Sequence, residues 1–417
     1  MGIKNIKISN FKSFNEIDVT LGDLNIIVGA NASGKSNFIQ IFKFLKDIVT
    51  DGLEDAISLQ SGIEYLRNVK LGSKKDFSIE FSHDDSYYRG IKMDAQSNLI
   101  LLKNILSQLK FGLSFTEGGD GFNIINQKFN QIFSLELLRT IPGQIELTTK
   151  NDGNGEFGFS FSEGKILQSH YNFKSHSKVI TDDDILPKFM FERTDSTNSL
   201  ILNIPYLPPF TLFNGVAIYD FDPKLSQRAV QIAGKSQLEE DGNNLAIVLK
   251  NILGEKEKER LFLNILEDIL PFIRQTKVEN IIDKSLSINV KEIYSEASLP
   301  ASLLSDGTIN LISLIVALYF EEKSIVIIEE PDRYIHPSLI PKVLEIIKDA
   351  SKKKQIIITT HNPEMVRYAD LENLFLVYRN KEGFSEIIKP ADKPIVNKFI
   401  QNNVSKEELF VQNLLGE

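Results

Sequence analysis

Hydrophobic and polar residues alternate in two segments near the start of the chain, and a third segment is almost entirely hydrophobic. Residues 3–11 and 17–21 carry the alternating pattern, which predicts two strands with one buried face. Leu24–Val28 is the hydrophobic run, as expected of a strand buried on both faces of a parallel sheet. Hydrophobic residues then recur at helical spacing from Lys35 to about Val49. This region therefore predicts two strands, a buried strand and an amphipathic helix.

The middle of the chain has a looser pattern. Residues 77–93 are typical of a pair of strands. Beyond them, the candidates are a helical piece around Leu99–Leu109 and an aromatic strand at Glu156–Phe161, with glycine-rich breaks between them. Structureless loops of such length are rare in compact domains, so we interpret residues 94–213 as an inserted α+β arm subdomain. The absence of a sustained heptad pattern excludes a long coiled-coil arm.

The C-terminal half alternates between predicted helices and predicted strands. The helices fall within 242–273 and at 309–319, and the strands fall at 285–293, 325–328, 355–360 and 374–378. Short hydrophobic strands that alternate with helices indicate an α/β fold with a parallel sheet.

Composition and charge exclude several classes of function. The 417 residues include no cysteine, which excludes disulfides, thiol catalysis and cysteine-ligated metal sites, and five scattered histidines leave little room for a histidine-built metal centre. The net charge of -9 argues against coating nucleic acid by bulk charge, although it leaves room for a local basic patch. The most hydrophobic run, Ile309–Phe320, is too short to span a bilayer, and the N-terminus lacks the core of a secretory signal. We therefore expect a cytoplasmic protein with no membrane partner.

The clearest chemical motif lies between the predicted buried strand and the first predicted helix. Residues 29–36 read Gly-Ala-Asn-Ala-Ser-Gly-Lys-Ser and match the phosphate-binding pattern G-x-x-x-x-G-K-[ST]. Its glycines let backbone N–H groups approach phosphate oxygens, and the following helix offers its positive N-terminal end. Lys35 would place a charge between the β- and γ-phosphates, and the Ser36 hydroxyl would ligate Mg²⁺. The alternative is a glycine-rich turn without a ligand, and the flanking strand and helix argue against it.

Two later strands end in ionisable residues. The strand at 325–328 leads into Glu329 and Glu330, and the strand at 355–360 leads into His361. Ligands bind at the carboxyl ends of strands in open α/β sheets, so Glu329 would hold Mg²⁺ through water and Glu330 would orient or deprotonate the attacking water. His361 would contact a γ-phosphate. Taken singly, a pair of acidic residues at a strand end is more often solvated, and a lone histidine is more often a polar residue whose hydrogen bonds are satisfied. Their occurrence in the same chain as a phosphate-binding loop is what favours phosphoryl transfer.

A fourth motif, Ser305-Asp306-Gly307-Thr308, precedes the hydrophobic helix at 309–319. Ser305 can cap that helix, and the Gly307 backbone can approach an anion at its N-terminus. In isolation, an ordinary capped helix start is the better interpretation.

The order of these motifs resembles that of ABC-type ATPases. The chain is most similar to the RecF/SMC/OLD group and to the stand-alone "AAA family ATPase" proteins of prokaryotic defence systems, which have no fused Toprim nuclease. The resemblance implies an α/β fold of the P-loop NTPase class, an ABC-type ATPase head with the inserted α+β arm subdomain. The stretches that carry it are Ile8–Phe14, Gly29–Asn37, Glu240–Ala246, Leu304–Thr308, Glu329–Pro331 with His336-Pro337, and Thr359–Pro363. No motif that we recognise falls within 94–213.

The resemblance implies ATP and Mg²⁺ as cofactors and gives each motif a role. The residues implied to bind the nucleotide are Gly29, Asn31, Ser33, Gly34, Lys35, Ser36, Asn37 and Lys12, with Ser305 and Gly307 completing the site of a second protomer. The residues implied to act in hydrolysis are Glu330, His361 and Lys35, and those implied to hold the metal are Ser36 and Glu329.

The chain departs from the family pattern in three ways. Glu329 replaces the more usual aspartate, and the signature reads Ser-Asp-Gly-Thr instead of Ser-Gly-Gly-Gln. No glutamine loop can be placed, since Gln60 and Gln96 are both unconvincing candidates. The residue that would sense the γ-phosphate opposite His361 is therefore not identified.

The motifs also divide the chain into predicted segments. These are residues 1–93, the first lobe of the ATPase head; 94–213, the arm; 214–298, a mainly helical segment; 299–390, the second lobe; and 391–417, a C-terminal tail.

The first functional hypothesis is an ATP-hydrolysing switch that works as a homodimer or higher oligomer and regulates an effector in antiphage defence. Because the chain after His361 is too short for a nuclease domain, the effector would be a separate nuclease or toxin. The alternative is a RecF/SMC-like DNA-binding ATPase of repair or chromosome maintenance, against which the net charge and the lack of coiled-coil arms weigh. Glu330 argues against a scaffold that binds ATP without turnover. The arm and the missing glutamine loop argue against a transporter cassette.

Overall fold

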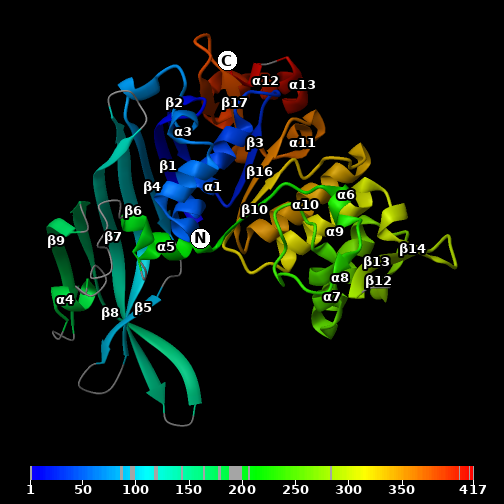
Figure 1. The fold of residues 1–417 in the computed structure, drawn as a ribbon, viewed down its shortest axis with the longest axis horizontal. Coiled ribbons are helices and arrows are strands. Elements are labelled where there is room, and N and C mark those ends of the chain that lie inside the picture. Colours follow the sequence, from blue (N-terminus) through cyan, green and yellow to red (C-terminus); the bar gives the residue numbers. More distant parts are fainter. Residues whose placement is uncertain are drawn as a thin grey trace. The chain divides into compact units, whose positions relative to one another are not determined.

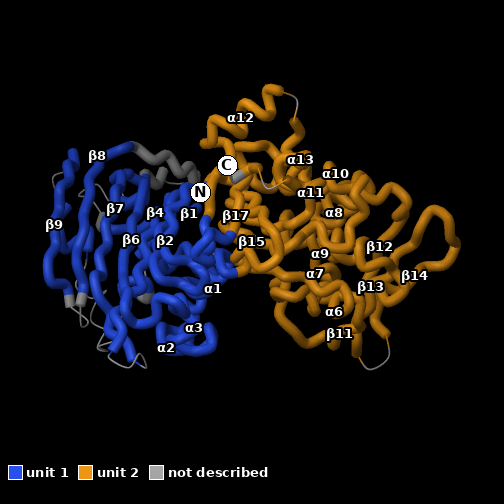
Figure 2. The backbone as a smooth tube through the Cα atoms, turned by 90° about the horizontal axis from the view of Figure 1, so that it is seen from above, with its two compact units in different colours: residues 1–21, 37–215, 379–386 blue, residues 22–36, 216–378, 387–417 orange. Residues whose placement is uncertain are grey.

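The computed structural model forms two compact units, each built from several stretches of the chain (Figure 2). Unit 1 consists of residues 1–21, 37–215 and 379–386, and unit 2 of residues 22–36, 216–378 and 387–417. The structure describes residues 2–84, 88–93, 99–116, 121–141, 144–162, 165–176, 180–186, 200–204, 207–281, 284–402, 404–412 and 414–416.

Unit 2 is built on a parallel sheet of short, hydrophobic strands. Its strands, in spatial order, are β10 (Val216–Tyr219), β15 (Ile325–Glu329), β16 (Gln355–Thr360), β3 (Leu24–Val28) and β17 (Leu374–Arg379) (Figure 1). Four of the five are the strands predicted at 24–28, 325–328, 355–360 and 374–378, and β10 is the addition. Because the strands are parallel, the residues that follow β3, β15 and β16 reach the same edge of the sheet.

Helices and a small antiparallel sheet complete unit 2. The helices are α6 (Pro223–Ser226), α7 (Leu245–Leu253), α8 (Lys256–Ile269), α9 (Asp306–Tyr319), α10 (Ile340–Ser351), α11 (Pro363–Tyr368), α12 (Pro394–Gln401) and α13 (Lys406–Val411). The small sheet contains β11 (Val230–Gln231), β12 (Ile273–Ile281), β13 (Ser285–Glu292) and β14 (Ser298–Pro300). Helix α9 is hydrophobic on nearly every side and buried from Thr308 to Leu318, so it forms the centre of this unit's core.

Unit 1 is mainly an antiparallel sheet. Its strands are β18 (Ser385–Ile388, which ends in unit 2), β2 (Phe14–Thr20), β1 (Gly2–Phe11), β4 (Phe77–Asp84), β6 (Leu99–Phe115), β7 (Phe122–Ile141), β8 (Gln144–Ser162) and β9 (Lys165–Ser175) in spatial order, with β5 (Tyr88–Met93) on β6. Its helices are α1 (Lys35–Asp51, which starts in unit 2), α2 (Leu53–Leu59), α3 (Ile63–Leu66), α4 (Asp182–Ile185) and α5 (Pro208–Asn214). Phe44 of α1 packs its ring against Phe11 of β1 and Phe77 of β4, at centroid distances of 6.2 and 5.9 Å, which fixes the helix on the sheet.

The helical piece predicted around Leu99–Leu109 is wrong, because the segment is part of β6. This strand pairs with β4 on one side and with β7 on the other. Its register with β7 shifts between Asn104 and Leu106 and again between Lys110 and Gly112. Each shift breaks the two-residue alternation of buried positions, so the hydrophobic residues take on a spacing that resembles a helix.

The boundaries of the two units differ from those of the predicted segments. Residue 93 lies inside unit 1, where β6 continues the sheet of β1 and β4, whereas one switch between units falls at Gly215 and Val216. Residues 118–120 of the predicted glycine-rich break, as well as Gln96, lie outside the described residues. The interpretation of residues 94–213 as an arm with its own task stays a prediction. Within the described part of the chain, no helix combines the length and hydropathy needed to cross a bilayer.

Candidate functional site

The turn between β3 and α1 has the conformation that its glycines predict. Gly34 and Ala32 adopt positive φ angles of 118° and 62°, and the Ser33 N–H donates to the Ala30 carbonyl at 3.2 Å. A side chain at Gly29 would place its Cβ 2.3 Å from the Val377 carbonyl oxygen, so only glycine fits there. The order of buried strand, glycine loop and helix confirms the predicted P-loop NTPase fold class.

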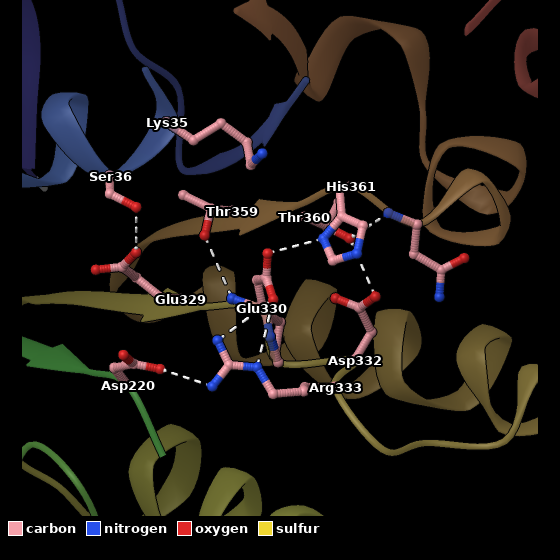
Figure 3. Close-up of polar contacts among 12 residues, drawn as sticks. Lys35, Ser36, Asp220, Glu329, Glu330, Asp332, Arg333, Thr359, Thr360 and His361 are labelled. Carbon is pink, nitrogen blue, oxygen red and sulfur yellow. Dashed lines mark hydrogen bonds and ion pairs between the residues drawn. The ribbon is translucent and has the colours of Figure 1, made fainter. Parts of the chain in front are cut away.

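Lys35, the first residue of α1, folds its side chain back over this loop (Figure 3). Its ammonium donates to the Gly29 carbonyl at 2.8 Å and to the Ala30 carbonyl at 3.1 Å. Burial lowers the pKa of Lys35, and the charges of Glu330 and Glu329 oppose that shift. The loop thus presents a partly desolvated cation, which is the group needed to attract a phosphate anion.

Ser36 and Glu329 meet at the end of β15. The Ser36 hydroxyl donates to Glu329 Oε2 at 2.9 Å (Figure 3). Burial raises the pKa of Glu329, because the ionised carboxylate has lost part of its hydration. A hydroxyl oxygen and a carboxylate oxygen are hard ligands, and Mg²⁺ is commonly held by one or two protein groups together with water and phosphate. These two residues therefore fit the predicted metal site.

Glu330 follows β15 in a backbone conformation that non-glycine residues rarely adopt. Its φ is +46°, and its N–H donates to the Thr359 carbonyl at 2.9 Å. Its Oε1 lies 2.7 Å from His361 Nδ1, and its Oε2 accepts from Arg333 Nε and Nη2 at 3.3 Å each (Figure 3). Both carboxylate oxygens are thus held by cationic or hydrogen-bonding side chains.

Three further residues of this region were missed by the sequence reasoning. Arg333 also donates through Nη1 to Asp220 at 3.1 Å, and Asn310 of α9 donates to the carbonyls of Pro331 and Arg333 at 3.1 and 2.8 Å. Asp220 directly follows the hydrophobic strand β10, as Glu330 follows β15, so the same strand-end signal could have found it. Asn310 is a polar residue within a hydrophobic helix, and this exception to the pattern could also have been found in the sequence.

Ser305 caps α9 as predicted. Its Oγ accepts from the Thr308 N–H at 3.1 Å. Gly307, in the first turn of the same helix, packs so tightly that a Cβ would lie 2.5 Å from the Tyr334 carbonyl oxygen. Helix α9 therefore packs closely against the turn that carries Glu330 and Arg333.

Replacing Gly307 with alanine should destabilise the protein by about 1–3 kcal/mol, because the new methyl group overlaps a backbone oxygen and relief of the overlap requires the backbone to shift. Chemical denaturation measures the free energy of unfolding. Gly254→Ala is the matched control, since Gly254 has φ of -75° and its Cβ would lie 3.4 Å from the nearest atoms. Equal stability of the two variants would show that the contact at Gly307 is unimportant.

The structure brings the predicted residues Lys35, Ser36, Glu329, Glu330 and His361 together within unit 2. Three other predicted or considered residues make their contacts in unit 1. Lys12 has φ of +46° and donates its N–H to the Leu66 carbonyl at 2.9 Å, and Asn37 donates its side-chain amide to Ser13 Oγ at 2.7 Å. Gln60 is buried at the end of α2.

The chain is similar to several known proteins. A family model described as "AAA domain, putative AbiEii toxin, Type IV TA system" matches residues 24–367. Endonuclease GajA of Bacillus cereus is 20% identical over 452 aligned residues, which cover all of this chain and 68% of that protein. Uncharacterized protein MJECL43 of Methanocaldococcus jannaschii is 30% identical over 66 residues, 16% of this chain and only 17% of that protein.

Solved structures of SMC heads are also similar. An SMC head bound to the C-terminal winged-helix domain of ScpA aligns with 93% of this chain and 98% of its own, at 18% identity and a TM-score of 0.48. The SMC head domain of Thermotoga maritima aligns with 93% of this chain and 99% of its own, at 14% identity and a TM-score of 0.42.

Proposed function

Because the chain belongs to the AAA-domain family whose model covers residues 24–367, we propose that it is an ABC-type switch that binds and hydrolyses ATP. The observation that carries the proposal is the convergence of a lysine, a metal-binding pair and a carboxylate on one sheet edge. Lys35 and the backbone of the Gly29–Ser36 loop would hold the phosphates. Glu330 would accept a proton from the attacking water, and His361 would contact the γ-phosphate.

Ser36 and Glu329 would hold Mg²⁺, which would neutralise the charge that develops on the phosphates. The raised pKa of Glu329 has a testable consequence. As the pH falls, Glu329 takes up a proton earlier than an exposed glutamate does, and a protonated carboxyl is a poor metal ligand.

We therefore expect the dependence of ATP affinity on Mg²⁺ to weaken as the pH falls below neutral, starting at a higher pH than an exposed glutamate would cause, and to weaken more in the wild type than in Glu329→Gln. Binding titrations with and without EDTA at each pH measure this dependence. The Glu329→Gln variant reports the part of the effect that protonation of ATP itself causes. An identical pH dependence in both proteins would remove Glu329 from the metal site.

We propose further that the active species is a dimer closed around two nucleotides. The support is the capped helix start at Ser305 and Gly307, which corresponds to the signature of the ABC group. In the Glu330→Gln variant, ATP should remain bound, so light scattering should find twice the monomer mass with ATP and Mg²⁺ but not with ADP. Ser305→Arg should prevent the change of mass. A mass that is the same with and without ATP would contradict ATP-driven dimerisation.

A role in antiphage defence through a separate effector, a nuclease or a toxin, is the biological part of the proposal. It is supported by the family description, which names a toxin of a toxin–antitoxin system, and by the similarity to an endonuclease. The test is phage plating on cells that carry the gene with its neighbours. Protection that is lost with Lys35→Ala is expected, and equal plating with and without the operon would contradict a defence role.

A further inference from the structure

Arg333 joins two carboxylates that belong to different strands. Its Nε and Nη2 donate to Glu330 Oε2 at 3.3 Å each, while its Nη1 donates to Asp220 Oδ1 at 3.1 Å (Figure 3). The guanidinium is planar and has a rigid fork of donors, so this double contact fixes its direction. Asp220 follows β10 and Glu330 follows β15, two neighbouring parallel strands.

The backbone of the turn does not need the Arg333 side chain. The Arg333 N–H donates to the Glu330 carbonyl at 3.0 Å, and Asn310 of α9 binds the carbonyls of Pro331 and Arg333. Thr360 donates to Asp332 at 3.1 Å and anchors the other side of the same turn. The Arg333 guanidinium is thus not needed to hold the turn, and its hydrogen bonds go to the two carboxylates.

The Glu330 carboxylate needs outside support to hold one orientation. Its residue sits in the left-handed region at φ of +46°, a strained conformation that persists only where surrounding contacts hold it. His361 binds one oxygen and Arg333 binds the other. An ionised carboxylate has about four lone-pair sites, two on each oxygen. Arg333 occupies both sites of Oε2 and His361 occupies one site of Oε1, so Oε1 can still accept a hydrogen bond from a water molecule.

Arg333 is also a cation that lies in direct contact with two acidic side chains at this sheet edge. Burial disfavours its charged form, but Asp220 and Glu330 outweigh that and raise the pKa of Arg333 above its usual value. The guanidinium therefore stays charged and offsets the repulsion between Glu330 and the neighbouring carboxylates of Glu329 and Asp220.

We propose that Arg333 is a positioning residue, which orients the Glu330 carboxylate toward the attacking water, and that Asp220 in turn anchors Arg333. The inference rests on the proposed ATP hydrolysis and adds two residues to it. Arg333 and Asp220 act through Glu330 and do not touch the nucleotide. Their loss should therefore slow turnover and leave ATP binding unchanged.

The test compares single and double variants in steady-state phosphate release. Arg333→Ala should lower kcat about 10- to 100-fold, because a misdirected base loses its near-attack geometry. Asp220→Asn should lower kcat by about tenfold or less, as expected of an outer partner. The KM for ATP and the ATP affinity should stay within about twofold of the wild-type values, since the lost interactions stabilise the transition state and not the bound ATP. Arg333→Lys should recover part of the loss, because it restores the charge without the fork.

The double variants separate positioning from a general structural effect. Arg333→Ala added to Glu330→Gln should cause no further loss, because its effect passes through Glu330. Asp220→Asn added to Arg333→Ala should likewise cause none. Arg367→Ala is the matched control, since Arg367 pairs with Glu364 at 3.5 Å in the same unit, and its kcat should not change. Equal thermal unfolding of Arg333→Ala and wild type shows that the fold is intact.

Three results would overturn the inference. The first is a kcat of Arg333→Ala within about twofold of the wild-type kcat, and the second is a kcat above that of the wild type. The third is that Arg333→Ala lowers kcat by the same factor in the Glu330→Gln background as in the wild type. If wild-type phosphate release equals that of Lys35→Ala, the proposed hydrolysis fails as well. If the wild type hydrolyses ATP and Arg333→Ala does so equally fast, only the inference about Arg333 fails.

Discussion

Lys35→Ala should weaken ATP binding by about 100-fold, which corresponds to about 2.7 kcal/mol. Truncating one partner of a desolvated charge pair costs several kcal/mol, and the Lys35 ammonium is the partly buried cation of the loop. Without it, the phosphates would keep only backbone N–H groups and the metal. Isothermal titration with ATP and Mg²⁺ measures the change.

The control for Lys35→Ala is Lys352→Ala. Lys352 lies in the same unit, and its ammonium forms an exposed ion pair with Asp349 at 3.1 Å. Its ATP affinity should match the wild type. Wild-type affinity in Lys35→Ala would mean that the loop does not hold the nucleotide.

Glu330→Gln should lower kcat for ATP hydrolysis by about 100-fold or more while ATP stays bound. Glutamine keeps the size of the side chain and can still accept a hydrogen bond from Arg333, but it cannot accept a proton at neutral pH. A positioned general base contributes about 10²–10⁴-fold to rate. Rapid-quench measurement of phosphate in the enzyme–ATP complex gives the chemical step directly.

The matched control is Glu322→Gln, since Glu322 is exposed and lies just before β15, at the opposite end of that strand from Glu330. Its rate should equal that of the wild type. A Glu330→Gln variant with wild-type turnover would leave ATP hydrolysis without the base assigned to it.

The elements of unit 2 that form the site could be predicted because each is encoded locally. Strand β3, the loop and α1 are consecutive in the sequence. Their hydrophobic patterns predict the strand and the helix, and the glycines predict the turn between them. Glu330 and His361 were found because both end hydrophobic strands, and parallel strands end at one edge.

Tertiary contacts could not be predicted in the same way. Arg333 and Asp220 lie 113 positions apart in the sequence, and no local sequence pattern predicts that their side chains pair. The contact of Gly307 with Tyr334 depends on how α9 packs against the turn after β15. The positive φ of Glu330 is imposed by that turn, since glutamate alone would favour another conformation.

The prediction of a helix in the segment that forms β6 was wrong for a related reason. Its two register shifts exist only when β7 is alongside, so the alternation that marks a strand is absent from the isolated sequence. Long-range pairing then outweighs the local pattern, as is common for strands.

The most direct test of ATP hydrolysis at this site is steady-state phosphate release by the wild type, with Mg²⁺ or with EDTA, beside Lys35→Ala and Glu330→Gln. We predict release that requires Mg²⁺ in the wild type and is lower in both variants, by about 100-fold or more in Glu330→Gln. Tight ATP binding by the wild type with phosphate release no greater than that of Glu330→Gln would contradict hydrolysis and would make the protein an ATP-binding scaffold.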